Sequence, residues 1–181
     1  MRKPGNKRSL FLWCSIGLNA LLAGSLAIGF VKGKEVTAFV VLTEIQHNLI
    51  ELEGLIENQR AQNWPAPNLV TTELNDIRAG IQLGMTVGGK IGTLSNTEIE
   101  VLQTLYFRLA QYPEDELYKF SVLTAEDKDR FEELRTFLRE SGLGLNMGVP
   151  KDLSHFISQV ERLVELMEES NDENARRGGR R

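Results

Sequence analysis

The chain has 181 residues, of which 41% are apolar and 25% charged, a composition that excludes a wholly disordered protein. Its single cysteine, Cys14, excludes an intramolecular disulfide and a thiolate zinc cluster within one chain. The net charge of −4 is unevenly distributed: residues 1–34 carry six bases and no acid, residues 176–181 carry four bases, and residues 35–174 hold 25 acids against 11 bases. Such an acidic body repels phosphate backbones, so we expect no nucleic-acid partner.

The first predicted element is a membrane span over residues 10–31. This stretch, LFLWCSIGLNALLAGSLAIGFV, contains no charged residue. As a helix it would be roughly 33 Å long, enough to cross the hydrocarbon core of a bilayer. We therefore expect residues 10–31 to contact lipid, with residues 1–9 forming a basic head.

The orientation of this span follows from its flanking charges. Four basic residues precede it, whereas two, Lys32 and Lys34, follow closely. The positive-inside rule then predicts a cytoplasmic N-terminus and an extracytoplasmic body, most naturally at a bacterial inner membrane. A cleaved signal peptide ending near Ser25-Leu26-Ala27 is the alternative, but the apolar run is longer than a signal-peptide core.

The extracytoplasmic body, residues 35–170, begins with a predicted helix over residues 35–62. Apolar residues, beginning with Val36 and Phe39, recur at helical spacing there and are expected to form one apolar face, and glutamates such as Glu53 are expected to lie off it. No breaker separates this helix from the span, so the two should form one rod. Two prolines in Asn63-Trp64-Pro65-Ala66-Pro67 end it.

The next predicted helix begins at Thr72, which we expect to cap it, and contains four glycines in strict i, i+4 spacing. Glycine in a helix interior costs about 1 kcal/mol relative to alanine, so a compensating contact is expected. Removing side chains lets another helix approach closely. We therefore predict a helix-packing face made by Gly80, Gly84, Gly88 and Gly92.

Two other interpretations of this segment are weaker. Gly84 to Lys90 match a phosphate-binding P-loop, but Ile91 replaces the magnesium-binding hydroxyl and a helix-like sequence precedes the motif. The alternation from Ile81 to Val87 would suit a hairpin turning at Gly88-Gly89. We expect neither a bound nucleotide nor any other cofactor.

Three further helices are predicted. Ser95 and Thr124 open capping-box patterns, and the latter precedes a charged helix. Residues 114–122 read as a short helix or irregular connection, and residues 141–150 as a loop. The last helix is expected over residues 152–169, followed by a disordered basic tail over residues 171–181. The predicted fold class is thus all-α, an N-terminal transmembrane helix followed by a four- to five-helix extracytoplasmic bundle.

Only two histidines are present, and they supply the one candidate metal site. His47 lies four residues before Glu51, and His155 would join them if the first and last helices packed together. Two solvated histidines on acidic helices are the simpler interpretation, so we assign no metal site and no catalytic residue.

The chain combines a short N-terminal anchor and a small helical domain with the residues Leu123-Thr124-Ala125-Glu126, which precede a charged helix. In this combination it resembles periplasmic helical stress and metal sensors. Those proteins often carry a Leu-Thr-x-Glu helix start. Their metal-binding residues do not map onto this sequence, so the resemblance does not assign the chain to that group.

These features predict a non-enzymatic protein that is anchored by one span. Its expected role is that of an accessory or scaffold subunit that binds a protein partner, or itself, through helix surfaces. The alternative is a periplasmic ligand- or metal-sensing domain that signals through a partner, since the cytoplasmic head is too short to hold a signalling module.

Overall fold

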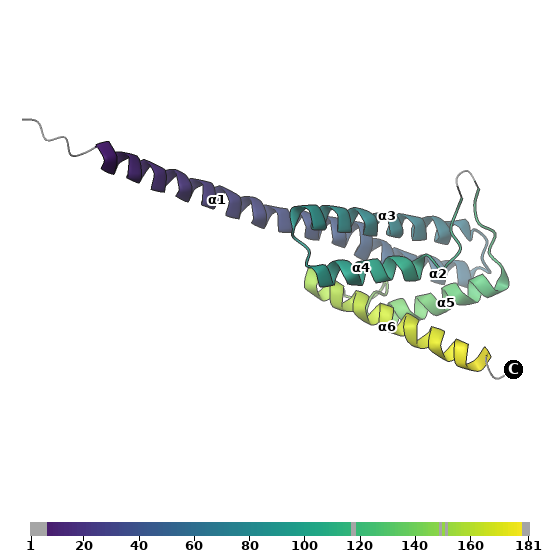
Figure 1. Cartoon of the computed structure of the whole chain (residues 1–181). Coiled ribbons are helices and arrows are strands. Elements are labelled where there is room, and N and C mark those ends of the chain that lie inside the picture. The colour runs from purple at the N-terminus through teal and green to yellow at the C-terminus, as the bar shows by residue number, and fades with distance from the viewer. Residues whose placement is uncertain (1–6, 117–118, 149, 151, 179–181) are drawn as a thin grey trace, which may run out of the picture.

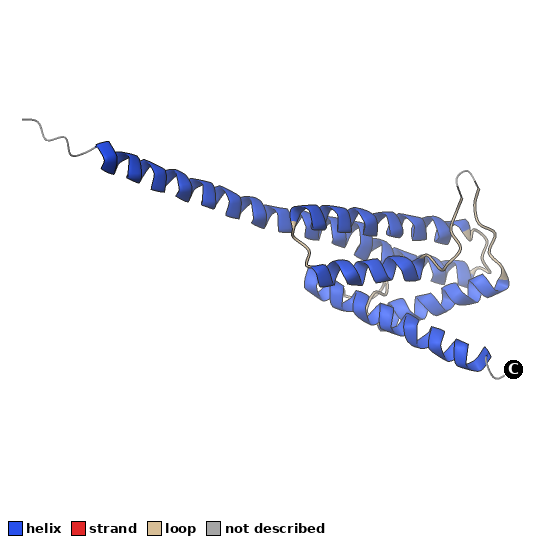
Figure 2. Cartoon of the chain, in the orientation of Figure 1, coloured by secondary structure: helices blue, strands red, loops and turns tan. Residues whose placement is uncertain are grey.

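The structure is a computed structural model that describes residues 7–116, 119–148, 150 and 152–178. Within these ranges all regular structure is helical and no strand forms (Figure 2). An isolated antiparallel bridge joins Glu116 to Lys119 in the connection between the fourth and fifth helices. The expected all-α fold class is confirmed at this level.

A single long rod forms the N-terminal third of the chain. It consists of α1 (Lys7–Val41), a π-helical turn η1 (Leu42–His47) and α2 (Asn48–Ala61), which follow one another without a break. Figure 1 shows that the first half of the rod extends away from the other helices, whereas its second half lies alongside them in the bundle. The continuity agrees with the sequence, but nothing in the sequence indicated the π-helical turn.

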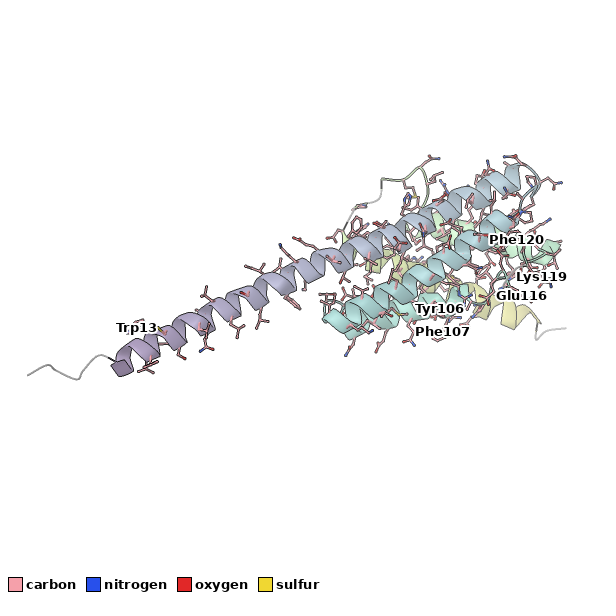
Figure 3. All side chains as sticks on the ribbon, turned by 90° about the horizontal axis from the view of Figure 1, so that it is seen from above. Trp13, Tyr106, Phe107, Glu116, Lys119 and Phe120 are labelled. Carbon is pink, nitrogen blue, oxygen red and sulfur yellow. The ribbon has the colours of Figure 1, made fainter. Side chains whose placement is uncertain are left out.

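The free half of the rod is exposed on all sides. Every residue from Phe11 to Lys32 is exposed, and Trp13 lies far from the bundle (Figure 3). By length and composition this helix is a candidate membrane span, and an N-terminal signal sequence satisfies the same criterion. A core helix of a soluble domain would be mostly buried, and here none of the apolar window is buried.

The third helix, α3 (Asn68–Ile91), begins earlier than expected. Pro67 occupies the N-cap position without a side-chain cap, so the predicted cap at Thr72 is wrong. The Thr72 hydroxyl donates instead to Asp115, as does that of Thr71. Because α3 runs unbroken through Ile91, the hairpin alternative is wrong, and the P-loop-like residues lie inside a helix rather than between a strand and a helix.

Both predicted capping boxes are present. Ser95 caps α4 (Asn96–Leu109) with Glu98, and Thr124 caps α5 (Ala125–Glu140) with Asp127. In each box the hydroxyl accepts the N3 backbone N–H while the N3 carboxylate accepts the N-cap N–H. Local sequence was therefore sufficient to locate both helix starts.

The last helix, α6 (Leu153–Gly178), is longer than predicted. It continues through most of the segment that we expected to be a disordered tail, and residues 179–181 lie outside the described residues. The sequence there places acids before arginines, an order that favours helix continuation through the helix dipole. The basic head is likewise only partly described, from Lys7 onward.

The rod and helices α3 to α6 enclose one apolar core, in which α1 lies against α3, α2 against α3 and α5, and α4 against α3 and α6 (Figure 1). Val36 and Phe39, which we expected on the apolar face of the first body helix, are instead 53% and 69% exposed. Fully buried side chains come from every element of the bundle: Ile45, Leu49, Leu52, Ile56, Leu74, Ile77, Ile81, Leu102, Leu105, Phe131, Leu134, Phe156 and Val160.

Candidate functional site: the glycine seam and the basal cavity

The rod contacts α3 through positions without side chains. A Cβ atom placed on Gly80 would overlap the carbonyl oxygen of Glu44 in η1. One placed on Gly84 would lie 3.1 Å from Val41 Cγ2 and 3.4 Å from Ile45 Cδ1. Both glycines are buried, so the backbone of α3 lies directly against the rod.

The same contact uses a glycine from the rod. A Cβ atom on Gly33 would lie 2.9 Å from Ile91 Cγ2. One helical turn further along the rod, the buried hydroxyls of Thr37 and Thr93 share a hydrogen bond of 2.6 Å. We call this contact, made by Gly33, Gly80 and Gly84, the glycine seam.

The two remaining glycines of the predicted face have other roles. A Cβ atom on Gly88 would overlap Leu94 in the following turn, so Gly88 makes room for the connection to α4 rather than for the rod. Gly92 ends α3 in the left-handed conformation, with φ of 71°, and nothing lies within 4 Å of its Cβ position. The prediction that Gly92 packs against a helix is therefore corrected: it is a helix C-cap.

The π-helical turn lies where the rod meets both α3 and α6. Gln46 in this turn is only 4% exposed, and its amide nitrogen lies within hydrogen-bonding distance of the Pro150 carbonyl (3.3 Å) and Gln159 Oε1 (3.4 Å). Gln159 in turn donates to the carbonyl of Gly142 at 2.9 Å. These bonds tie the centre of the rod to α6 and to the loop before it, because a buried amide is costly to leave unpaired.

A buried carboxylate ties α2 to α5. Glu53 is 2% exposed; its Oε1 accepts a hydrogen bond from Arg139 (3.2 Å) and its Oε2 one from the N–H of Leu145 (2.8 Å). Arg135 Nε lies 3.1 Å from the same Oε1 as an ion pair, without the alignment of a hydrogen bond. Arg135 also pairs with Glu57 at 2.9 Å.

The expectation that Glu53 lies off the apolar face is therefore wrong. Its position four residues after Leu49 and three before Ile56 places it on that face. The two arginines of α5 make its burial possible by balancing its charge. The i+4 spacing from Leu49 was the available signal, but sequence periodicity does not identify the partners of a buried acid.

The candidate metal ligands are not brought together into a complete site. His47 Nε2 lies 4.0 Å from Glu51 Oε2, and both side chains are more than half exposed. His155 is exposed on the first turn of α6, where its backbone N–H donates to Asp152 Oδ1. Among the described residues, no group of three or more His, Cys, Asp or Glu side chains has the arrangement of a metal site.

Glu73 on α3 lies close enough to Glu51 for the two carboxylates to interact. From the sequence we expect Glu73 only to favour the positive end of the helix dipole, and its burial was not predicted. Burial, and then the charges of Glu51 and Asp76, raise the pKa of Glu73 from 4.5 to about 7. Its Oε1 is shut off from solvent without a hydrogen-bond partner in the described part of the chain. Ionised Glu73 is thus an unfavourable group in the folded state.

Because the pKa of Glu73 is raised on folding, the contribution of Glu73 to stability should fall as pH rises from 4.5 to about 7, and its full penalty should be present above pH 7. Glu73→Gln removes the ionisation. We expect it to match wild type near pH 4 and to be more stable by about 1 kcal/mol at pH 8, after discounting for solvent screening. Urea unfolding of both proteins at the two pH values measures the difference, and a gain confined to low pH would contradict this assignment.

A cavity of about 580 Å³ lies at the end of the bundle from which the rod emerges. We call it the basal cavity. It is bounded by α1, by the turn between α3 and α4, and by the start of α6. Its lining residues are Phe30, Lys34, Glu35, Ala38, Gly92, Thr93, Leu94, Ser95, Glu98, Asp152, Leu153 and Ser154.

Comparison with known proteins yields no match, whether the chain is compared with protein-family models, with curated proteins or with solved structures. What the chain can do must therefore be inferred from its own geometry. That geometry consists of an uncovered apolar helix, a continuous helical junction between this helix and a bundle, and a cavity beside the junction.

Proposed function

We propose that this protein is a single-pass membrane-anchored subunit with no catalytic role, which holds its helical bundle at a fixed position beside the membrane for a protein partner. The main support is that one unbroken rod is uncovered in its apolar half and packs one side against the bundle in its other half. A bundle joined to its anchor in this way cannot reorient freely, which suits a scaffold.

The contacts that fix the other helices to the rod support the same proposal. The glycine seam fixes α3 to the rod, Gln46 fixes α6, and Glu53 fixes α5. Polar groups that are buried and paired hold one arrangement, because any other arrangement leaves them unpaired. We infer that the bundle and the second half of the rod act as one rigid body.

The flanking charges favour a cytoplasmic N-terminus, with the bundle outside the cytoplasm at an inner membrane. Leu18→Arg with Leu22→Arg should prevent membrane retention, since each arginine at a span centre costs about 2.5–3.5 kcal/mol. Phe39→Arg, beyond the span, is the matched control and should remain in the membrane pellet after alkaline carbonate washing. Recovery of wild type as soluble protein would contradict the anchor.

Two measurements test the orientation of the span and whether the N-terminal segment is cleaved. A reporter active only outside the cytoplasm should be active when fused after the bundle. The intact mass should remain 20.4 kDa. A product shortened by removal of residues 1–27 would instead establish a cleaved signal peptide.

The partner surface should include exposed apolar side chains of the bundle. Phe107 on α4 is 58% exposed, and Phe120 and Val122, which follow the Glu116–Lys119 bridge, are 62% and 88% exposed. Figure 3 labels Phe107 and Phe120. Hydrophobic side chains of this kind are typical of contact surfaces when they cluster. Cross-linking in intact membranes should give a defined partner that is lost in Phe107→Asp or Val122→Asp. An unchanged cross-linking pattern in both would contradict a scaffold role for these surfaces.

A further inference from the structure

The basal cavity lies beside the end of the apolar part of the rod. Phe30 lines it from within the expected span, whereas Lys34, Glu35 and Ala38 line it from the next two turns. Lys34 is three residues beyond the end of the apolar run, a rise of about 4.5 Å along a helix. If the span crosses a bilayer as proposed above, the mouth of the cavity lies at the level of the lipid headgroups.

The charged groups around this cavity have both signs. Lys34 supplies one ammonium, held 5.3 Å from the centre of the Phe30 ring, and three carboxylates come from Glu35, Glu98 and Asp152. Two of these carboxylates are fixed by helix caps: Glu98 accepts from Ser95, and Asp152 from Ser154 and from a backbone N–H. The hydroxyl of Ser154 above all keeps the pKa of Asp152 below its usual range, so this group is an anion.

We propose that the basal cavity binds the headgroup of an ethanolamine phospholipid. Lys34 would pair with the lipid phosphate, and the lipid ammonium would donate hydrogen bonds to the carboxylates of Glu35 and Asp152. The excess of acid over base disfavours anionic headgroups, and a choline headgroup has no N–H to donate. The cavity of about 580 Å³ is within the size range of small-molecule sites.

The test uses the full chain in nanodiscs that contain equal amounts of ethanolamine, glycerol and choline phospholipids with identical acyl chains. After gentle delipidation, native mass spectrometry counts the lipids retained. We expect ethanolamine lipid to exceed each of the others by about tenfold, the factor that one charge-assisted hydrogen bond gives. Equal retention of all three lipids, or a preference for the glycerol lipid, would overturn the proposal.

Variants locate the binding site. Ala38→Trp should fill the cavity and abolish the preference, whereas Ala79→Trp on the exposed face of α3 should keep it. Glu35→Gln, at an exposed position that poses no risk to packing, should reduce it. A preference that survives both Ala38→Trp and Glu35→Gln would place the lipid elsewhere. A protein that remains in membranes but shows no lipid preference refutes this site and leaves the anchor intact.

Discussion

Gly80→Ala is expected to lower the free energy of unfolding by about 2 kcal/mol, although alanine is the better helix former. The added methyl group would overlap the carbonyl oxygen of Glu44, and the Glu44 carbonyl carbon would be only 3.0 Å away. A backbone carbonyl cannot rotate aside as a side chain can, so the rod and α3 must separate. Urea unfolding of the full-length chain in detergent, followed by circular dichroism, measures the loss.

Gly89→Ala is the matched control for this prediction. It lies in the same helix, but its Cβ would meet only Ile99 Cδ1, at an ordinary contact distance of 3.6 Å. The gain in helix propensity should therefore dominate, raising stability by up to about 1 kcal/mol. If the two variants changed stability in the same direction and by similar amounts, close packing at the glycine seam would be refuted.

Glu53→Ala should have the larger effect, a loss of about 3–5 kcal/mol. The substitution leaves Arg135 and Arg139 without their buried anion and the N–H of Leu145 without its acceptor. It also leaves a void where a 2% exposed side chain had been. The same unfolding assay measures it, and α5 should become the least protected helix in hydrogen exchange.

The comparison for Glu53 is Glu57→Ala, one turn later on α2. Glu57 also pairs with Arg135, but its side chain is 40% exposed, so water can replace the lost contact. We expect a loss below about 1 kcal/mol there. Similar losses for Glu53 and Glu57 would mean that burial adds nothing to the ion pair, contrary to the structure.

The two substitutions weaken different helix–helix contacts within the same bundle. Gly80→Ala loosens the rod against α3, whereas Glu53→Ala loosens α2 against α5. If the scaffold proposal is correct, either variant should weaken partner cross-linking without releasing the protein from the membrane. Loss of cross-linking would then follow from the altered position of the bundle, because the exposed contact residues themselves are unchanged.

Much of this organisation could be predicted because it is local. The capping boxes at Ser95 and Thr124 involve residues three apart, and the apolar stripe of α6 repeats with the helical period. The unbroken run from the apolar segment into α2 follows from the absence of proline in that stretch. The start of α3 was missed because Thr72 has a long-range partner, Asp115, that competes with its expected capping role.

The candidate site was predictable only in part. The glycine spacing pointed to close packing, but the same spacing did not distinguish Gly80, which faces the rod, from Gly92, which ends the helix. The basal cavity brings together residues from the rod, the turn after α3 and the start of α6. Because these residues are far apart in the sequence, no local sequence pattern predicts that they line one cavity.

The amino-acid sequence by itself determined the helical class, the apolar N-terminal segment with its flanking charges and the separation of an acidic body from basic ends. It could do so because helix period, caps, length and charge are properties of neighbouring residues. Only the tertiary structure decided which glycines contact the rod, why Glu53 can be buried and where a cavity opens beside the end of the apolar helix. Those outcomes depend on which helix faces meet, and a single helix contains no information about the side chains it will meet.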